Sequence, residues 1–85
     1  MRFVYILKCA DESLYTGITT DLDRRILEHN TGNKGAKYTK VRRPVELVFS
    51  QECEDRSDAS KKEYSIKQLT KQQKLNIIQT KILPE

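Results

Sequence analysis

The 85-residue sequence predicts an α+β fold in which helices flank a three-stranded mixed or antiparallel sheet, in the order β-β-α-β-α-α. Three observations support this fold. Residues 3–9 are almost continuously apolar, residues 45–49 alternate between apolar and more polar side chains, and residues 57–69 carry apolar side chains at helical spacing. A chain of this length has room for one small core, so we expect a single domain over residues 1–85.

The first two strands form a hairpin. The apolar run is typical of a central strand covered on both faces, and residues 13–17 return beside it. We expect a three-residue loop between them, which places Tyr5 opposite Gly17 and Tyr15 opposite Leu7. Both tyrosines then point to the same face of the sheet, whereas a two- or four-residue loop would place them on opposite faces.

A helix follows the hairpin. Either Thr20 or Asp21 can cap its first turn, and Thr20 with Asp23 has the spacing of a capping box. Gly32 stands just past its end, where a left-handed C-cap residue is favoured.

This helix also carries the first candidate functional residues. Leu22 and Ile26 form its apolar stripe, and Arg25 and His29, also four apart, lie on the margin of that stripe. A cation and an imidazole at the edge of a buried face suggest a role beyond solubility. The alternative is that Arg25 is a surface ion-pair residue and His29 a core histidine with satisfied hydrogen bonds.

Residues 31–43 are basic and contain no acidic side chain. Cations interleaved with an aromatic ring suit a phosphate backbone and an unstacked base. The candidate nucleic-acid-binding residues are Lys34, Lys37, Tyr38, Lys40, Arg42 and Arg43. The alternative is an ordinary solvated loop with one helical turn at 36–40.

The third strand is expected at 44–53, with Val45, Leu47 and Phe49 on its more apolar face. The helix at 57–69 then places Glu63 on its inner side, because this residue follows Ala59 by four positions and precedes Ile66 by three. Burying an unpaired carboxylate costs several kcal/mol, so Glu63 calls for an arginine, a metal ion, or both.

A last short helix spans residues 71–80. Thr70 and Gln73 have the capping-box spacing at its start. Its expected apolar contacts are Leu75, Ile78 and Ile82.

Composition narrows the class of partner. The net charge of +4 and the pI of about 9.2 favour an anionic partner, most commonly nucleic acid. Cys9 and Cys53 are read as reduced thiols, and with one histidine they are too few for a closed zinc site. The N-terminal apolar run is too short for a membrane span and lacks a secretory cleavage pattern, so we expect a cytoplasmic protein without membrane contact.

The hairpin, the first helix and the later glutamate together resemble the GIY-YIG nuclease family in order and spacing. The residues that carry the resemblance are Phe3-Val4-Tyr5, Tyr15-Thr16-Gly17, Arg25, His29 and Glu63. It covers about residues 2–75, and residues 35–49 further resemble the small stand-alone bacterial branch of single-domain proteins. Phe3-Val4 replaces Gly-Ile and Thr16 replaces Ile, both at backbone and packing positions.

The resemblance implies metal-dependent hydrolysis of DNA phosphodiester bonds, in repair or recombination. Glu63 would hold Mg²⁺ or Mn²⁺, and Arg25 would grip a non-bridging phosphate oxygen. Tyr5 would act as general base, which requires Arg25 and the metal to lower its pKa from near 10. Tyr15 would orient the water or the phosphate, and His29 would hydrogen-bond Tyr5 or the phosphate.

The sequence is also compatible with two other classes of function. The chain could be a non-catalytic nucleic-acid-binding module on the same fold, or a small protein-interaction domain, although no obligate protein partner is evident. Tyr5 and Tyr15 could be half-buried strand residues with hydrated hydroxyls, and Glu63 could pair with Arg25 only to join two helices.

Overall fold

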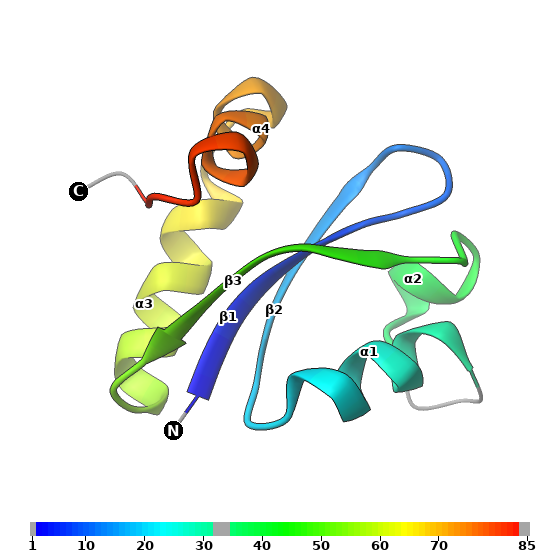
Figure 1. Ribbon diagram of the computed structural model, residues 1–85, viewed down its shortest axis with the longest axis horizontal. Helices are drawn as coiled ribbons and strands as arrows, with labels where there is room; N and C mark the ends of the chain where they lie inside the picture. Colours follow the sequence, from blue (N-terminus) through cyan, green and yellow to red (C-terminus); the bar gives the residue numbers. More distant parts are fainter. Residues whose placement is uncertain (1, 32–34, 84–85) are drawn as a thin grey trace.

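In the computed structural model, which describes residues 2–31 and 35–83, a three-stranded sheet lies between two pairs of helices (Figure 1). The central strand β1 pairs antiparallel with β2 on one side and with β3 on the other, so the sheet is antiparallel throughout. The elements in chain order are β1 (Arg2–Lys8), β2 (Leu14–Thr19), α1 (Leu22–Asn30), α2 (Lys37–Lys40), β3 (Glu46–Cys53), α3 (Arg56–Lys67) and α4 (Lys71–Thr80).

The hairpin has the predicted register. Tyr5 pairs with Gly17 and Leu7 with Tyr15, so both tyrosines share one face of the sheet. Glu12, in the connecting loop, adopts a left-handed φ of 71° and donates its backbone N–H to the carbonyl of Cys9. This register places Tyr5 beside a residue without a side chain.

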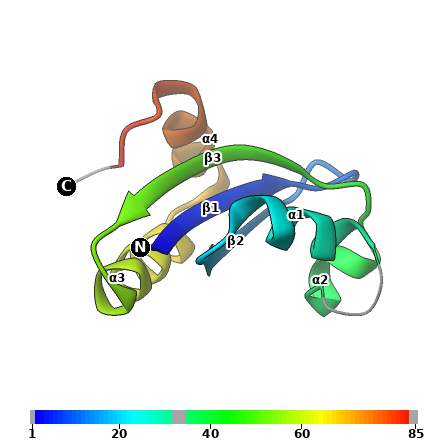
Figure 2. The same ribbon diagram turned by 60° about the horizontal axis from the view of Figure 1, so that its bottom comes forward.

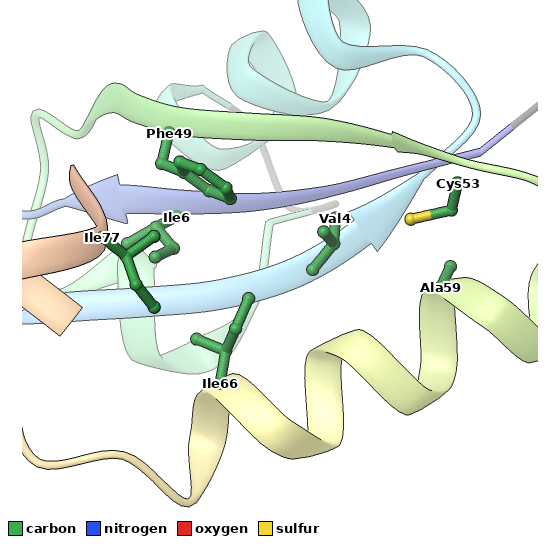
Figure 3. Packing of buried hydrophobic residues seen from close by; sticks show 7 residues of the cluster. All are labelled: Val4, Ile6, Phe49, Cys53, Ala59, Ile66 and Ile77. Atoms are coloured by element: carbon green, nitrogen blue, oxygen red, sulfur yellow. The ribbon is translucent and has the colours of Figure 1, made fainter. Parts of the chain in front are cut away.

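Strand β1 is covered on both faces, as its apolar composition predicts. Val4 and Ile6 point towards α3 and α4, where they pack with Phe49, Cys53, Ala59, Ile66 and Ile77 (Figure 3). Tyr5 and Leu7 point to the opposite face, where α1 covers them with Leu22 and Ile26. Figure 2 shows α1 crossing in front of the sheet. The residues that the structure describes therefore form two small cores, one on each face of the sheet, in place of the single core expected, and the second contains Tyr5.

The predicted alternation of β3 is wrong because the strand contains a bulge. Ile6 pairs with Phe49, but the next residue of β1 pairs with Leu47, which leaves Val48 as the extra residue. As a result Val45 packs in the core around Tyr5, Phe49 packs in the opposite core, and Leu47 is 38% exposed. The bulged carbonyl of Val48 accepts a hydrogen bond of 2.7 Å from the Lys81 amine.

The helix ends follow local capping rules. Asp21 is the N-cap of α1 and accepts a hydrogen bond from the backbone N–H of Arg24, so the predicted Thr20–Asp23 capping box is wrong. The predicted capping box of α4 is confirmed between Thr70 and Gln73. The predicted C-cap Gly32 lies outside the described residues.

The apolar contacts of α4 differ from the expectation. Ile77 is the buried anchor of this helix at 2% exposure, and Ile78 packs beside it, whereas Leu75 is 39% and Ile82 70% exposed. Cys9 and Cys53 are free buried thiols. Among the residues described, no helix has both the length and the apolar character needed to cross a bilayer.

Candidate active site

Tyr5 and His29 meet in the core between the sheet and α1. The Tyr5 Oη lies 2.9 Å from His29 Nε2, and the two side chains are 1% and 0% exposed. The other ring nitrogen, Nδ1, lies 2.8 Å from Thr39 Oγ1 on α2. The phenol, the imidazole and the hydroxyl thus form one hydrogen-bonded chain that links β1, α1 and α2.

Gly17 provides the space for this phenol. A Cβ atom on residue 17 would lie 2.5 Å from Tyr5 Oη and 2.7 Å from Cζ, closer than any side chain tolerates. Because these two residues are paired across the hairpin, the glycine lets the ring lie over the backbone of β2 and reach His29. The last residue of the second tyrosine motif is therefore needed for packing against the first.

Arg25 approaches the same phenol from α1. Its guanidinium makes a hydrogen bond to Tyr5 and a second, of 2.9 Å, from Nη1 to Glu28 Oε1. Glu28 also accepts a longer contact of 3.9 Å from Arg24. The Arg25 side chain is 28% exposed, so its guanidinium connects a buried phenol to the surface.

Tyr15 packs beside the imidazole rather than bonding to it. Its ring meets His29 edge-on at 5.2 Å between centroids and stacks with Tyr38 at 6.0 Å. The guanidinium of Arg42 lies 3.9 Å from the centre of the Tyr38 ring, and its Nε lies 3.0 Å from Asp11 in the hairpin loop. An aromatic and cationic stack thus joins the hairpin to the basic segment.

Glu63 acts on the phenol from α3. Its carboxylate is 25% exposed and pairs at 3.4 Å with Lys67 one turn later, whereas the sequence suggested an arginine or a metal. Its negative charge disfavours ionisation of the Tyr5 phenol and so contributes to the raised pKa of Tyr5. The phenol therefore has a hydrogen bond from Arg25, and the charge of Glu63 opposes its ionisation.

The protonation states of Tyr5 and His29 follow from their burial. Burial raises the pKa of Tyr5 to about 12, and the hydrogen bond from Arg25 only partly offsets it. Arg25 thus lowers the pKa of Tyr5, as expected, but burial outweighs this effect, and the expected lowering by a bound metal stays a prediction. Burial, aided by the charge of Arg25, lowers the pKa of His29 to about 4. At neutral pH the pair consists of a phenol and a neutral imidazole.

The basic residues divide into two groups. Lys37 and Lys40 lie on α2, and Arg42 carries its guanidinium at the surface with 32% exposure. Arg43 instead donates from Nε to the backbone carbonyl of His29 at 2.6 Å and from Nη2 to that of Thr31 at 3.2 Å. These hydrogen bonds satisfy carbonyl groups at the C-terminal end of α1. Lys34 lies outside the described residues.

The donor set suits a hard cation that keeps most of its water. Among residues 2–31 and 35–83, no three His, Cys, Asp or Glu side chains gather into a metal-binding group. Magnesium is commonly held by one or two carboxylates, with waters and substrate phosphate completing its shell. A single, partly exposed Glu63 fits that pattern and does not fit a closed zinc site.

Two contacts of the site were missed from the sequence. Glu28 stands three residues after Arg25, a helical pair that spacing alone could have shown. Thr39 reaches His29 across ten positions and two elements, and no local pattern predicts that contact.

The family assignment rests on comparison with known proteins. The model of the GIY-YIG catalytic domain matches residues 1–76. UPF0213 protein DP2720 from Desulfotalea psychrophila is 59% identical over 76 residues, which cover 89% of this chain and 69% of that protein. UPF0213 protein SERP0126 from Staphylococcus epidermidis is 58% identical over 78 residues, which cover 92% of this chain and 94% of that protein.

Solved structures agree. The NMR structure of UPF0213 protein BH0048 from Bacillus halodurans matches with a TM-score of 0.62 and 45% identity, covering 95% of this chain and 86% of that one. The NMR structure of protein EF2693 from E. faecalis matches with a TM-score of 0.65 and 41% identity, and the match covers 99% of this chain and 88% of that one. The chain belongs to the GIY-YIG family of nuclease domains, and the relatives named above include small UPF0213 proteins from bacteria.

Proposed function

We propose that this protein is a divalent-metal-dependent endonuclease that hydrolyses DNA phosphodiester bonds. The observation that carries the proposal is the hydrogen bond between the Tyr5 phenol and a neutral His29, with Arg25 on the same phenol. A buried phenol with a base behind it and a guanidinium beside it can take a proton from water next to a bound phosphate.

Proton transfer through Tyr5 to His29 does not require a free phenolate. As the water oxygen forms its bond to phosphorus, its proton passes to Tyr5 Oη, while the phenol proton passes to His29 Nε2. The P–O bond to the leaving group breaks, and the leaving oxygen takes up a proton from solvent. A phenol with a pKa of about 12 therefore acts as a conduit, and the imidazole, with a pKa of about 4, accepts the proton during the step and then releases it to solvent.

Three further residues serve the phosphate. Arg25 binds a non-bridging oxygen as charge develops, because a guanidinium has five N–H donors and can serve several acceptors. Tyr15 orients the water or the phosphate at the mouth of the site. Glu63 would hold Mg²⁺ or Mn²⁺, which would neutralise the phosphate and stabilise the leaving oxygen.

The basic segment holds the DNA outside the catalytic centre. We assign phosphate contacts to Lys34, Lys37, Lys40 and Arg42, with Tyr38 offering an aromatic edge, and we assign Arg43 to the support of α1. We further propose that the substrate is structured DNA formed in repair or recombination in the cytoplasm.

A cleavage assay tests this function. Labelled single-stranded, duplex, flap and forked DNAs are incubated with Mg²⁺, Mn²⁺ or EDTA and with the native protein, Glu63→Ala or Arg25→Ala. We expect metal-dependent cleavage by the native protein that is absent in both variants. Salt-sensitive binding without cleavage in any metal would contradict the proposal and identify a nucleic-acid-binding module.

A further inference from the structure

We propose that Thr39 is a positioning residue that fixes the tautomer of His29, so that the ring presents a lone pair to Tyr5. Its catalytic consequence rests on the nuclease function proposed above. The tautomer itself can be measured without any substrate.

The hydroxyl of Thr39 contacts two groups, a backbone carbonyl and a ring nitrogen of His29. The side chain is 0% exposed, and Oγ1 lies 3.0 Å from the carbonyl oxygen of Ala36 and 2.8 Å from His29 Nδ1. The hydroxyl donates to the Ala36 carbonyl, which also accepts the backbone N–H groups of Thr39 and Lys40 at 3.1 and 3.0 Å. With the hydroxyl proton on Ala36, the lone pairs of Oγ1 face Nδ1, and Nδ1 carries the ring proton.

This proton position determines the role of the other ring nitrogen, Nε2 of His29. A neutral imidazole has one N–H, so a protonated Nδ1 leaves Nε2 as an acceptor facing the phenol at 2.9 Å. Tyr5 therefore donates its proton to His29. The opposite tautomer would point an N–H at the phenol oxygen and would leave the ring unable to take the phenol proton.

The segment that carries Thr39 is held against His29 at both ends. A Cβ atom on Gly35 would lie 2.8 Å from the carbonyl of Glu28 and 2.9 Å from the Cα of His29, so the backbone packs there without a side chain between. At the other end, Arg43 donates to the carbonyl of His29 at 2.6 Å. These contacts hold α2 where the Thr39 hydroxyl meets the ring.

Nitrogen-15 NMR of the imidazole tests the assignment, and the chain contains a single histidine. In the native protein we expect the Nδ1 signal of a protonated nitrogen and the Nε2 signal of an acceptor. Thr39→Ser should keep this pattern, and Thr39→Val should shift it towards the other tautomer or a mixture. A native spectrum with the proton on Nε2, or a Thr39→Val spectrum identical to the native one, would overturn the proposal.

Turnover supplies the second readout. We expect Thr39→Val to lower kcat on the order of 10-fold or more with KM unchanged, and Thr39→Ser to restore it. Thr16→Val is the matched control, because the buried Thr16 Oγ1 has no hydrogen-bond partner in the described structure. Equal decreases in both valine variants would overturn the positioning role. A native protein with the expected spectrum but no cleavage would refute the nuclease function alone.

Discussion

The oxygen of the Tyr5 phenol occupies space that a side chain on Gly17 would need. The Cβ position of residue 17 lies 2.5 Å from that oxygen. The same oxygen makes the 2.9 Å contact to His29, so the absence of one methyl group on β2 decides whether β1 and α1 can share a hydrogen bond. The two tyrosine motifs are thus parts of one packing unit.

Gly17→Ala should disrupt this unit. The added methyl group pushes the phenol away from His29, and overpacking of this kind costs about 1–3 kcal/mol of folding free energy. We expect a lower Tm in thermal denaturation and a decrease in cleavage rate on the order of 100-fold. Ser50→Ala is the control, because Ser50 pairs with Tyr5 from the opposite strand and is exposed. Native cleavage by Gly17→Ala would contradict the packing argument.

The buried His29 should make stability depend on pH. Its pKa is about 4 in the folded protein and 6.5 in the unfolded chain, so between these values the unfolded chain binds more protons. The free energy of unfolding should therefore fall as the pH falls through this window, by on the order of 3 kcal/mol from this group. Urea denaturation of the native protein and of His29→Gln measures it. Equal pH slopes in the two proteins would refute the prediction.

Glu63→Gln should separate metal binding from DNA binding. The amide keeps the size of the side chain but removes the charge that attracts a divalent cation, so Mn²⁺ affinity measured by electron paramagnetic resonance should fall on the order of 10-fold or more. DNA affinity in EDTA should stay within about twofold, since Glu63 is assigned no role in holding DNA. Asp58→Asn is a matched control, because Asp58 also pairs with a lysine four residues later on α3. If that control weakened Mn²⁺ binding equally, Glu63 would not be the metal ligand.

The basic segment should give two distinct phenotypes. Lys37→Ala and Lys40→Ala should weaken DNA binding and reduce the slope of its salt dependence by about 0.9 for each phosphate that is no longer neutralised, with little change in Tm. Arg43→Ala removes donors to the carbonyls of His29 and Thr31, so it should lower stability by about 1–3 kcal/mol. Fluorescence anisotropy across a salt series and thermal denaturation measure both effects. An Arg43→Ala protein with native Tm and weakened binding would reassign Arg43 to the DNA surface.

The parts of the fold that the sequence predicts correctly depend on neighbouring residues. The hairpin register follows from loop length and the period of two in a strand, and the capping box of Thr70 and Gln73 follows from a spacing of three. The bulge at Val48 was not predicted, because a bulge depends on how β3 meets the already paired β1.

The candidate site likewise has features that the sequence predicts and features that depend on the packed structure. Spacing identifies Arg25 and His29 as neighbours on one helix, and the family resemblance adds Tyr5 and Glu63. The pKa of Tyr5 could not be read from the sequence, because burial sets its direction and burial is a property of the packed core. The Thr39 contact depends on the path of the whole segment between α1 and β3.

Tyr5 is proposed to conduct a proton during hydrolysis of DNA. Single-turnover cleavage by the native protein and by Tyr5→Phe, with DNA binding measured in parallel, is the decisive test. We predict a rate lower by a factor of about 10² to 10⁴ for Tyr5→Phe, with binding unchanged. A Tyr5→Phe protein that binds and cleaves like the native protein would show that the Tyr5 hydroxyl does not conduct the proton.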